Sequence, residues 1–169
     1  MDTFHYIAIS FHILAAVIWI GGAIFLAAVL VPVLRDPALR PHAPELIRRA
    51  GVRFRNLGWA CLLILVATGA VNLGRWGVDW PRFTSAALWS TAWGRILALK
   101  LGLVVVVLAL SAMHDFVVGP RARARMRQAP GSREAMRLRR CAGWMGRLNV
   151  LLGVVIVALA VMLTRGPPI

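Results

Sequence analysis

The sequence predicts an all-α integral membrane protein, a four-helix up-down-up-down bundle with both termini outside. Three observations predict this fold class: 60% of the residues are hydrophobic, the mean hydropathy is +0.75, and the apolar residues form four long runs. Ordinary soluble domains have an apolar content nearer to half, so the composition excludes that class. Residues 1–169 are expected to form a single membrane domain.

The four apolar runs give the expected membrane spans. The first covers residues 6–34 and holds no formally charged residue. At about 1.5 Å per residue it is longer than a hydrocarbon core of about 30 Å. The other three are expected at residues 57–73, 96–118 and 145–164. Helices that follow one another in antiparallel order pack most simply as an up-down bundle.

The distribution of arginine predicts which side of the membrane each loop faces. The loop over residues 35–56 holds six arginines and the loop over residues 119–144 holds eight, whereas the loop over residues 74–95 holds three. Because positive residues stay on the cytoplasmic side, the first two are expected to be cytoplasmic basic loops and the third an outer loop. Residues 80–89 of the outer loop are typical of a short amphipathic helix that lies on the outer leaflet.

The formal net charge of +14 indicates an anionic partner. On a chain of apolar spans, a basic surface favours anionic lipids at the cytoplasmic face of the bilayer over nucleic acid. We therefore expect the lipid bilayer as a partner and no nucleic acid, with a homo-oligomer or a membrane complex left open. The sequence has no classical nucleophile, phosphate loop or acid–base carboxylate pair, which excludes hydrolase and kinase functions.

A histidine inside the first span is the leading candidate for a functional residue. An imidazole in lipid is costly unless it faces the protein interior and finds a partner. His12 is therefore expected either to bind a ligand or to hydrogen-bond a neighbouring helix. His5, His12 and Trp19 are each seven residues apart and share one helical face. The rise from His5 to His12, about 10.5 Å, is too long for one metal ion, so they are expected to be two separate stations.

The other polar residues of the spans form an outer and an inner layer. Lys100 lies about as deep as His12 and is expected either to extend toward the outer headgroups or to neutralise an anionic ligand such as a porphyrin propionate. The candidate metal ligands or haem axial ligands are His12, His5, His114 and Met162; the ligand-charge partner is Lys100; and the inner polar layer is Cys61, Asp115 and Asn149.

Several of these segments resemble a known family. Residues 12–22, residues 93–100 and the Gly-Pro-Arg at residues 119–121 resemble the copper resistance protein D family. Residues 146–166 are similar to the short four-helix members of that family. The resemblance implies a multi-pass protein of the bacterial inner membrane that is linked to copper uptake or tolerance.

A second resemblance points to haem. A histidine in the first span, a tryptophan seven residues later, a following glycine and a lysine in the third span are similar to the bacterial membrane-bound haem protein that oxidises protoporphyrinogen. This resemblance implies that His12 is the haem ligand and that Lys100 is an essential basic partner.

Three functions are therefore left open: copper handling, haem b binding with a redox activity, and a non-catalytic accessory subunit of a membrane complex. Cu(I) favours Met, Cys and His ligands, and a path across the membrane would use His5, His12 and Met162, then His114, Cys61 and Met145. Two histidines of one chain are not expected to share a haem, because His114 lies about 20 Å deeper than His12. An enzymatic role is the less favoured alternative.

Overall fold

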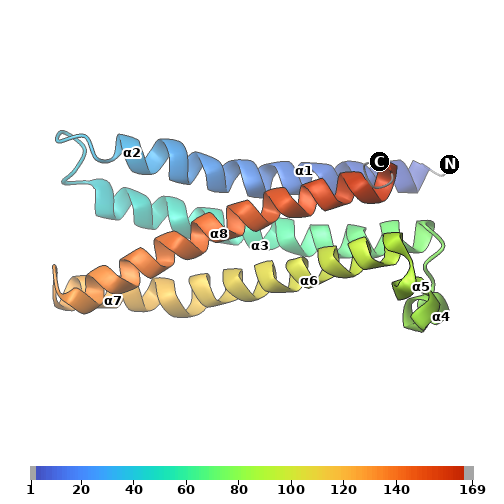
Figure 1. Cartoon of the computed structure of the whole chain (residues 1–169). Helices are drawn as coiled ribbons and strands as arrows, with labels where there is room; N and C mark the ends of the chain where they lie inside the picture. Colours follow the sequence, from blue (N-terminus) through green and yellow to red (C-terminus); the bar gives the residue numbers. More distant parts are fainter. Residues whose placement is uncertain (1–2, 166–169) are drawn as a thin grey trace. The chain divides into compact units, whose positions relative to one another are not determined.

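The computed structural model describes residues 3–165, and this part of the chain is helical without a strand (Figure 1). Four helices are long and apolar enough to cross a membrane: Thr3–Val33, Ala43–Arg75, Ala92–Gln128 and Arg133–Arg165. The predicted all-α membrane fold with four spans is confirmed. The chain divides into two compact units, Met1–Leu88 and Trp89–Ile169, and each is described by itself.

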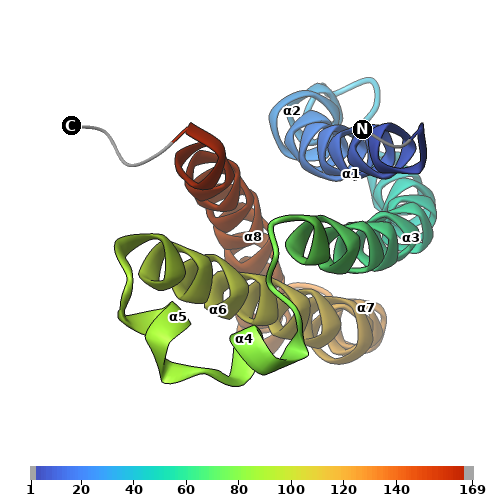
Figure 2. The same cartoon turned by 90° about the vertical axis from the view of Figure 1, so that its right-hand side faces the viewer.

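The first unit is a pair of long helices. Its elements are α1 (Thr3–Phe25), the π-helical turn η1 (Leu26–Leu30), α2 (Val31–Val33), α3 (Ala43–Arg75) and α4 (Trp80–Thr84). Helices α1 (dark blue) and α3 (teal) run antiparallel and pack against each other (Figures 1 and 2).

Glycines along the contact between α1 and α3 let the two helices approach closely, as small residues do in membrane helix pairs. A Cβ added at Gly58 would lie 3.5 Å from the indole of Trp19, and one at Gly69 would lie 3.6 Å from the imidazole of His12. At Gly22 the added atom would lie 2.5 Å from the ring of Phe54.

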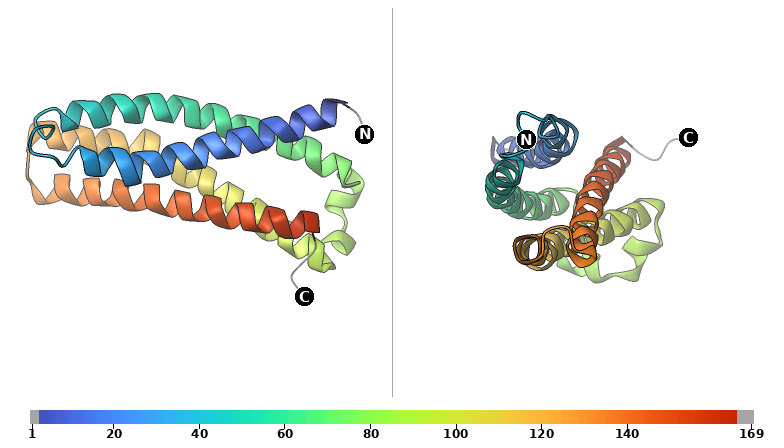
Figure 3. Two further views of the ribbon diagram at one scale, coloured as in Figure 1. Left: turned by 90° about the horizontal axis from the view of Figure 1, so that it is seen from above. Right: turned by 90° about the vertical axis from the view of Figure 1, so that its left-hand side faces the viewer.

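The second unit is built from the remaining long helices. It contains α6 (Ala92–Ala112), the π-helical turn η2 (Met113–Val118), α7 (Gly119–Gln128) and α8 (Arg133–Arg165). The boundary between the two units falls within α5 (Ala86–Ser90). Helix α8 runs antiparallel to α6 and α7 and packs against both (Figure 3). A hydrogen bond from Trp93 Nε1 to the carbonyl of Leu163, 3.2 Å long, links one end of the pair.

Two prolines explain the two π-helical turns. A proline has no N–H to donate, and its ring clashes with the carbonyl four residues earlier. That carbonyl belongs to η1 for Pro32 and to η2 for Pro120. The wider turn accommodates the ring, so each helix continues past its proline instead of ending there.

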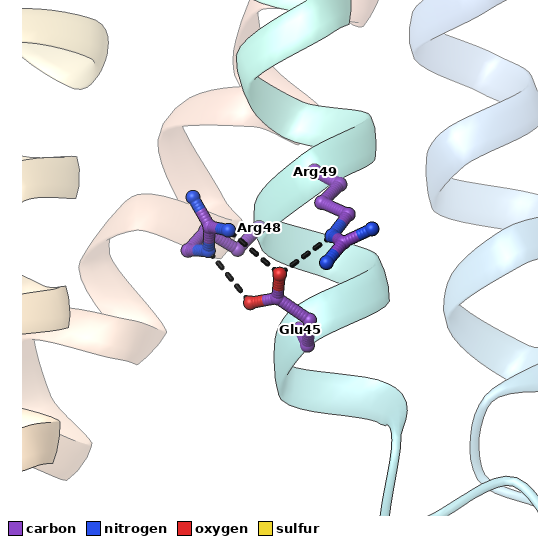
Figure 4. A network of polar contacts seen from close by, with 3 residues as sticks. All are labelled: Glu45, Arg48 and Arg49. Carbon is purple, nitrogen blue, oxygen red and sulfur yellow. Dashed lines mark hydrogen bonds and ion pairs between the residues drawn. The ribbon is translucent and has the colours of Figure 1, made fainter.

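The cytoplasmic basic loops predicted at residues 35–56 and 119–144 are largely helical. Helix α3 begins at Ala43 and α8 at Arg133, and each is 33 residues long, or about 50 Å, which exceeds the hydrocarbon thickness. Near the start of α3, Glu45 accepts hydrogen bonds from Arg48 and Arg49 at 2.6 Å (Figure 4). Ion pairs between residues three and four positions apart stabilise a helix in its charged, water-exposed part.

The outer loop contains two short helices where the sequence predicted one, so that prediction is wrong in this detail. Helices α4 and α5 (green in Figure 2) are separated by Ser85, whose backbone is extended. The Ser85 hydroxyl accepts a hydrogen bond from the amide of Ala87, at 3.3 Å, and Thr84 donates to the carbonyls of Trp80 and Pro81. Such local side-chain bonds compete with a continuous helix.

Candidate functional site

His12 lies on α1 at the contact with α3. Its Nδ1 atom is 2.7 Å from the hydroxyl oxygen of Thr68, and that hydroxyl donates to the carbonyl of Ile64 at 2.6 Å. A threonine hydroxyl has one hydrogen. When the hydroxyl gives this hydrogen to Ile64, its oxygen accepts at His12, an arrangement that corresponds to the tautomer with the proton on Nδ1.

The contact with Thr68 is thus compatible with the tautomer that carries its proton on Nδ1. With the proton on Nδ1, the lone pair is on Nε2, which is the atom able to bind a metal or a haem iron. Histidines that bind metals in proteins commonly donate their other ring N–H to a fixed acceptor, which sets the ring orientation. Thr68 supplies such an acceptor from the neighbouring helix.

Two further candidates of the first unit lie along the same helix contact. His5 is two turns before His12 on the same face of α1. Cys61 is 3% exposed and lies seven residues before Thr68 on α3, about 10.5 Å along the helix. His5, His12 and Cys61 thus lie along the α1–α3 pair as possible metal ligands, each about two helical turns from the next.

Two buried polar atoms near the end of this contact where α1 begins and α3 ends are unsatisfied. His5 Nδ1 and Asn72 Oδ1 are buried and have no hydrogen-bond partner within residues 3–165. Asn72 is one turn beyond Thr68 on α3, so it lies between the levels of the two histidines. Buried atoms of this kind cost free energy unless a bound group satisfies them.

The second unit holds the remaining predicted candidates. His114 and Asp115 lie in η2, with Nδ1 and Oδ1 2.8 Å apart. Asn149 on α8 donates to the hydroxyl of Ser111 on α6 at 2.8 Å, and its own Oδ1 is buried without a partner in the described part of the chain. Lys100 on α6 and Met162 on α8 are both partly buried.

The donors do not form a ready-made chelate. Across residues 3–165, no three His, Cys, Asp or Glu side chains come close enough together to hold one metal ion. Each histidine of the first unit can therefore offer a single ring nitrogen at its own depth.

The sequence analysis did not identify the two hydroxyl groups that hydrogen-bond to these polar side chains. Thr68 and Ser111 were not among the candidates, although each is the residue that fixes a polar side chain of the facing helix. The available signal was their position inside apolar spans, with Thr68 four residues from Asn72 and Ser111 three residues from His114.

Comparisons with known proteins agree with this architecture. The family profile described as Copper resistance protein D matches residues 48–163, which begin within α3 and end near the end of α8. A protein of Aquifex aeolicus (strain VF5) described as "Uncharacterized protein" is 29% identical over 157 residues, covering 92% of this chain and 92% of that protein. No solved structure matches the chain.

Proposed function

Because the chain belongs to the copper resistance protein D family, we propose that it binds copper inside the membrane and that His12 is the central ligand. It is a multi-pass membrane protein related to copper resistance. The bacterial inner membrane, with both termini outside, is the location that the arginine distribution favours.

The observation that supports this proposal is the chain of hydrogen bonds from His12 through Thr68 to Ile64. It orients the imidazole within an apolar helix pair and is compatible with the tautomer whose lone pair is on Nε2. Imidazole is a good ligand for copper, and an apolar surrounding weakens competition from water.

The other donors of the helix contact suggest the route of the metal. His5 would receive copper near the outer surface, His12 would hold it about 10.5 Å deeper, and the thiol of Cys61 would offer a soft ligand at the next level. Each step is too long for simultaneous binding, so the ion would move by exchange between sites. The unsatisfied Oδ1 atom of Asn72 adds a polar group between the levels of His5 and His12.

Copper titration of the purified protein tests this proposal. The full chain in detergent would be titrated with Cu(I) against a coloured Cu(I) chelator, for the wild type, His12→Ala and His42→Ala. His42 is exposed and precedes α3, so it serves as a matched control. We expect His12→Ala alone to lower the copper stoichiometry. Equal binding by all three proteins would refute the assignment of His12.

Haem b is the second candidate, and the same tautomer of His12 favours it, since a haem iron would also bind at Nε2. Haem would supply redox chemistry, while this chain would orient the axial imidazole through Thr68. The visible absorption spectrum of the purified protein distinguishes the two ligands. A Soret band that disappears in His12→Ala would establish haem, and a colourless protein without bound copper would favour an accessory subunit.

A further inference from the structure

Two sulfur atoms lie together on α8, in the second unit. Cys141 Sγ and Met145 Sδ are 4.0 Å apart, on residues one helical turn from each other. Cys141 is exposed, whereas Met145 is 9% exposed and packs inside its unit. One sulfur is therefore held in place and the other is open to ligands from the solvent.

The separation of these atoms suits a metal that has three ligands. At a metal–sulfur distance of about 2.3 Å, an ion bound to both atoms would have an S–metal–S angle of roughly 120°. That angle leaves one position of a trigonal site for a ligand from outside. A thiolate and a thioether select Cu(I) among the common metals, while zinc takes four nitrogen, sulfur or oxygen ligands.

A further polar atom lies on the same face of α8, beyond the sulfur pair. Asn149 follows Met145 by one turn, and its Oδ1 is buried without a hydrogen-bond partner in the part of the chain that the structure describes. Its amide nitrogen is already used by Ser111. This fixed, buried acceptor is available to a donor that accompanies a ligand on this face.

The charge around Cys141 indicates what the outside ligand is. Arg137, Arg139 and Arg140 precede it on α8 and are all exposed, and α7, which packs against α8, contributes four more arginines. Between α7 and α8, Arg125 forms an ion pair with Glu134, with Nε and Oε1 3.1 Å apart. The surroundings of the open sulfur therefore attract an anionic ligand.

We propose that Cys141 and Met145 form a second Cu(I) site, at which the metal is exchanged with an anionic thiol. This inference rests on the proposed copper function and adds the chemical class of the partner. On binding, the Cys141 thiol releases its proton to solvent and a sulfur–copper bond forms. The ion stays Cu(I), so no electron is transferred, and the partner's thiolate occupies and then vacates the third position.

Protection of Cys141 from alkylation tests the site directly. The full chain in detergent would be treated with a maleimide with and without Cu(I), and the modified peptides quantified by mass spectrometry. We expect Cu(I) to slow the modification of Cys141 on the order of tenfold or more. Zn(II) at the same concentration should not. Glutathione added to the Cu(I)-loaded protein, and removed by desalting before the maleimide is added, should restore the rate because it carries the metal away. Equal rates with and without Cu(I), or equal protection by Zn(II), would overturn the proposal.

Variants separate this site from the one at His12. Met145→Leu keeps the volume and should remove the protection, while Met136→Leu on the exposed part of the same helix should keep it. His12→Ala should leave the protection of Cys141 intact. Protection that is lost in Met136→Leu as readily as in Met145→Leu would refute the sulfur pair. If His12→Ala loses copper and Cu(I) does not protect Cys141 in any variant, the result would support the copper site at His12 and refute the second site at Cys141 and Met145.

Discussion

His12 on α1 and Thr68 on α3 are joined by a 2.7 Å contact whose direction is set by the carbonyl of Ile64. The sequence alone offers two alternatives for His12, a hydrogen bond to a neighbouring helix or the binding of a ligand. The contact with Thr68 is compatible with both roles at once. As a hydrogen bond between helices it contributes to the packing of α1 on α3. As an acceptor for Nδ1–H it also leaves the lone pair on Nε2, where a metal can bind.

Replacing Thr68 tests the second role. Thr68→Val has nearly the same shape but cannot accept the proton of His12, so the ring loses its preferred tautomer and orientation. We expect the affinity for Cu(I) to fall by about 10–100-fold, as for other partners of metal-binding histidines. Thr68→Ser should keep most of the affinity. Competition titration with a coloured chelator measures all three proteins.

Thr164 provides the matched control for that substitution. Its hydroxyl also bonds to the carbonyl four residues earlier, Ala160, at 3.3 Å, but it is exposed near the end of α8. Thr164→Val should leave copper affinity at the wild-type level. An affinity that is unchanged in Thr68→Val as well would show that the hydroxyl does not prepare His12 for a metal.

Gly22 tests the close packing of α1 on α3. The Cβ of Gly22→Ala would lie 2.5 Å from Cε2 of Phe54, so the ring or the helix has to move. We expect a loss of about 1–3 kcal/mol in the free energy of unfolding. Denaturation curves of the purified protein in detergent measure this loss. Gly21→Ala meets no atom within 4 Å and should be neutral or stabilising by up to about 1 kcal/mol.

A second substitution at Phe54 verifies the cause. Phe54→Leu removes the ring atoms that the new methyl group would meet, so it should recover part of the stability lost in Gly22→Ala. The two changes are then expected to be non-additive. Equal stability of Gly22→Ala and Gly21→Ala would contradict the packing of Gly22 against Phe54.

The polar contact between α6 and α8 permits a double-mutant cycle. Asn149 donates to Ser111, which is 6% exposed, at 2.8 Å. Measured interhelical hydrogen bonds in membrane proteins average about 0.6 kcal/mol and reach about 1.7 kcal/mol. We expect a coupling energy in that range for Ser111→Ala with Asn149→Ala, from unfolding in detergent. A coupling near zero would mean that the bond does not stabilise this unit.

The fold was predictable from the sequence because the signal is strong and local. Hydropathy marks the spans, and the four apolar helices confirm them. It does not mark where a helix ends in water: α8 begins at Arg133, twelve residues before its predicted span. Arginine, alanine and methionine are good helix formers, so a helix continues through them after the apolar pattern has stopped.

The site was predictable only in part, for a physical reason. His12 is conspicuous because imidazole is rare and costly in lipid. A threonine in an apolar span is ordinary, and its importance depends on which residue of the neighbouring helix it meets. That register is fixed by the fit of Gly58 against Trp19 and of Gly69 against His12, which no pattern within one helix contains. The sulfur pair of Cys141 and Met145 was not predicted because hydropathy begins the fourth span at residue 145 and leaves Cys141 in a loop, whereas α8 begins at Arg133 and places both residues on one helix.

The orientation of the chain in the membrane can be tested with its own cysteines. Fourteen arginines in the two inner loops, against three in the outer loop, predict that Cys141 faces the cytoplasm. A membrane-impermeant maleimide should therefore leave Cys141 unmodified in intact spheroplasts and modify it after permeabilisation. Cys61 is 3% exposed and should resist the reagent in both cases, which makes it an internal control. Modification of Cys141 in intact spheroplasts would place the arginine-rich helices α7 and α8 outside and reverse the direction of the proposed copper route.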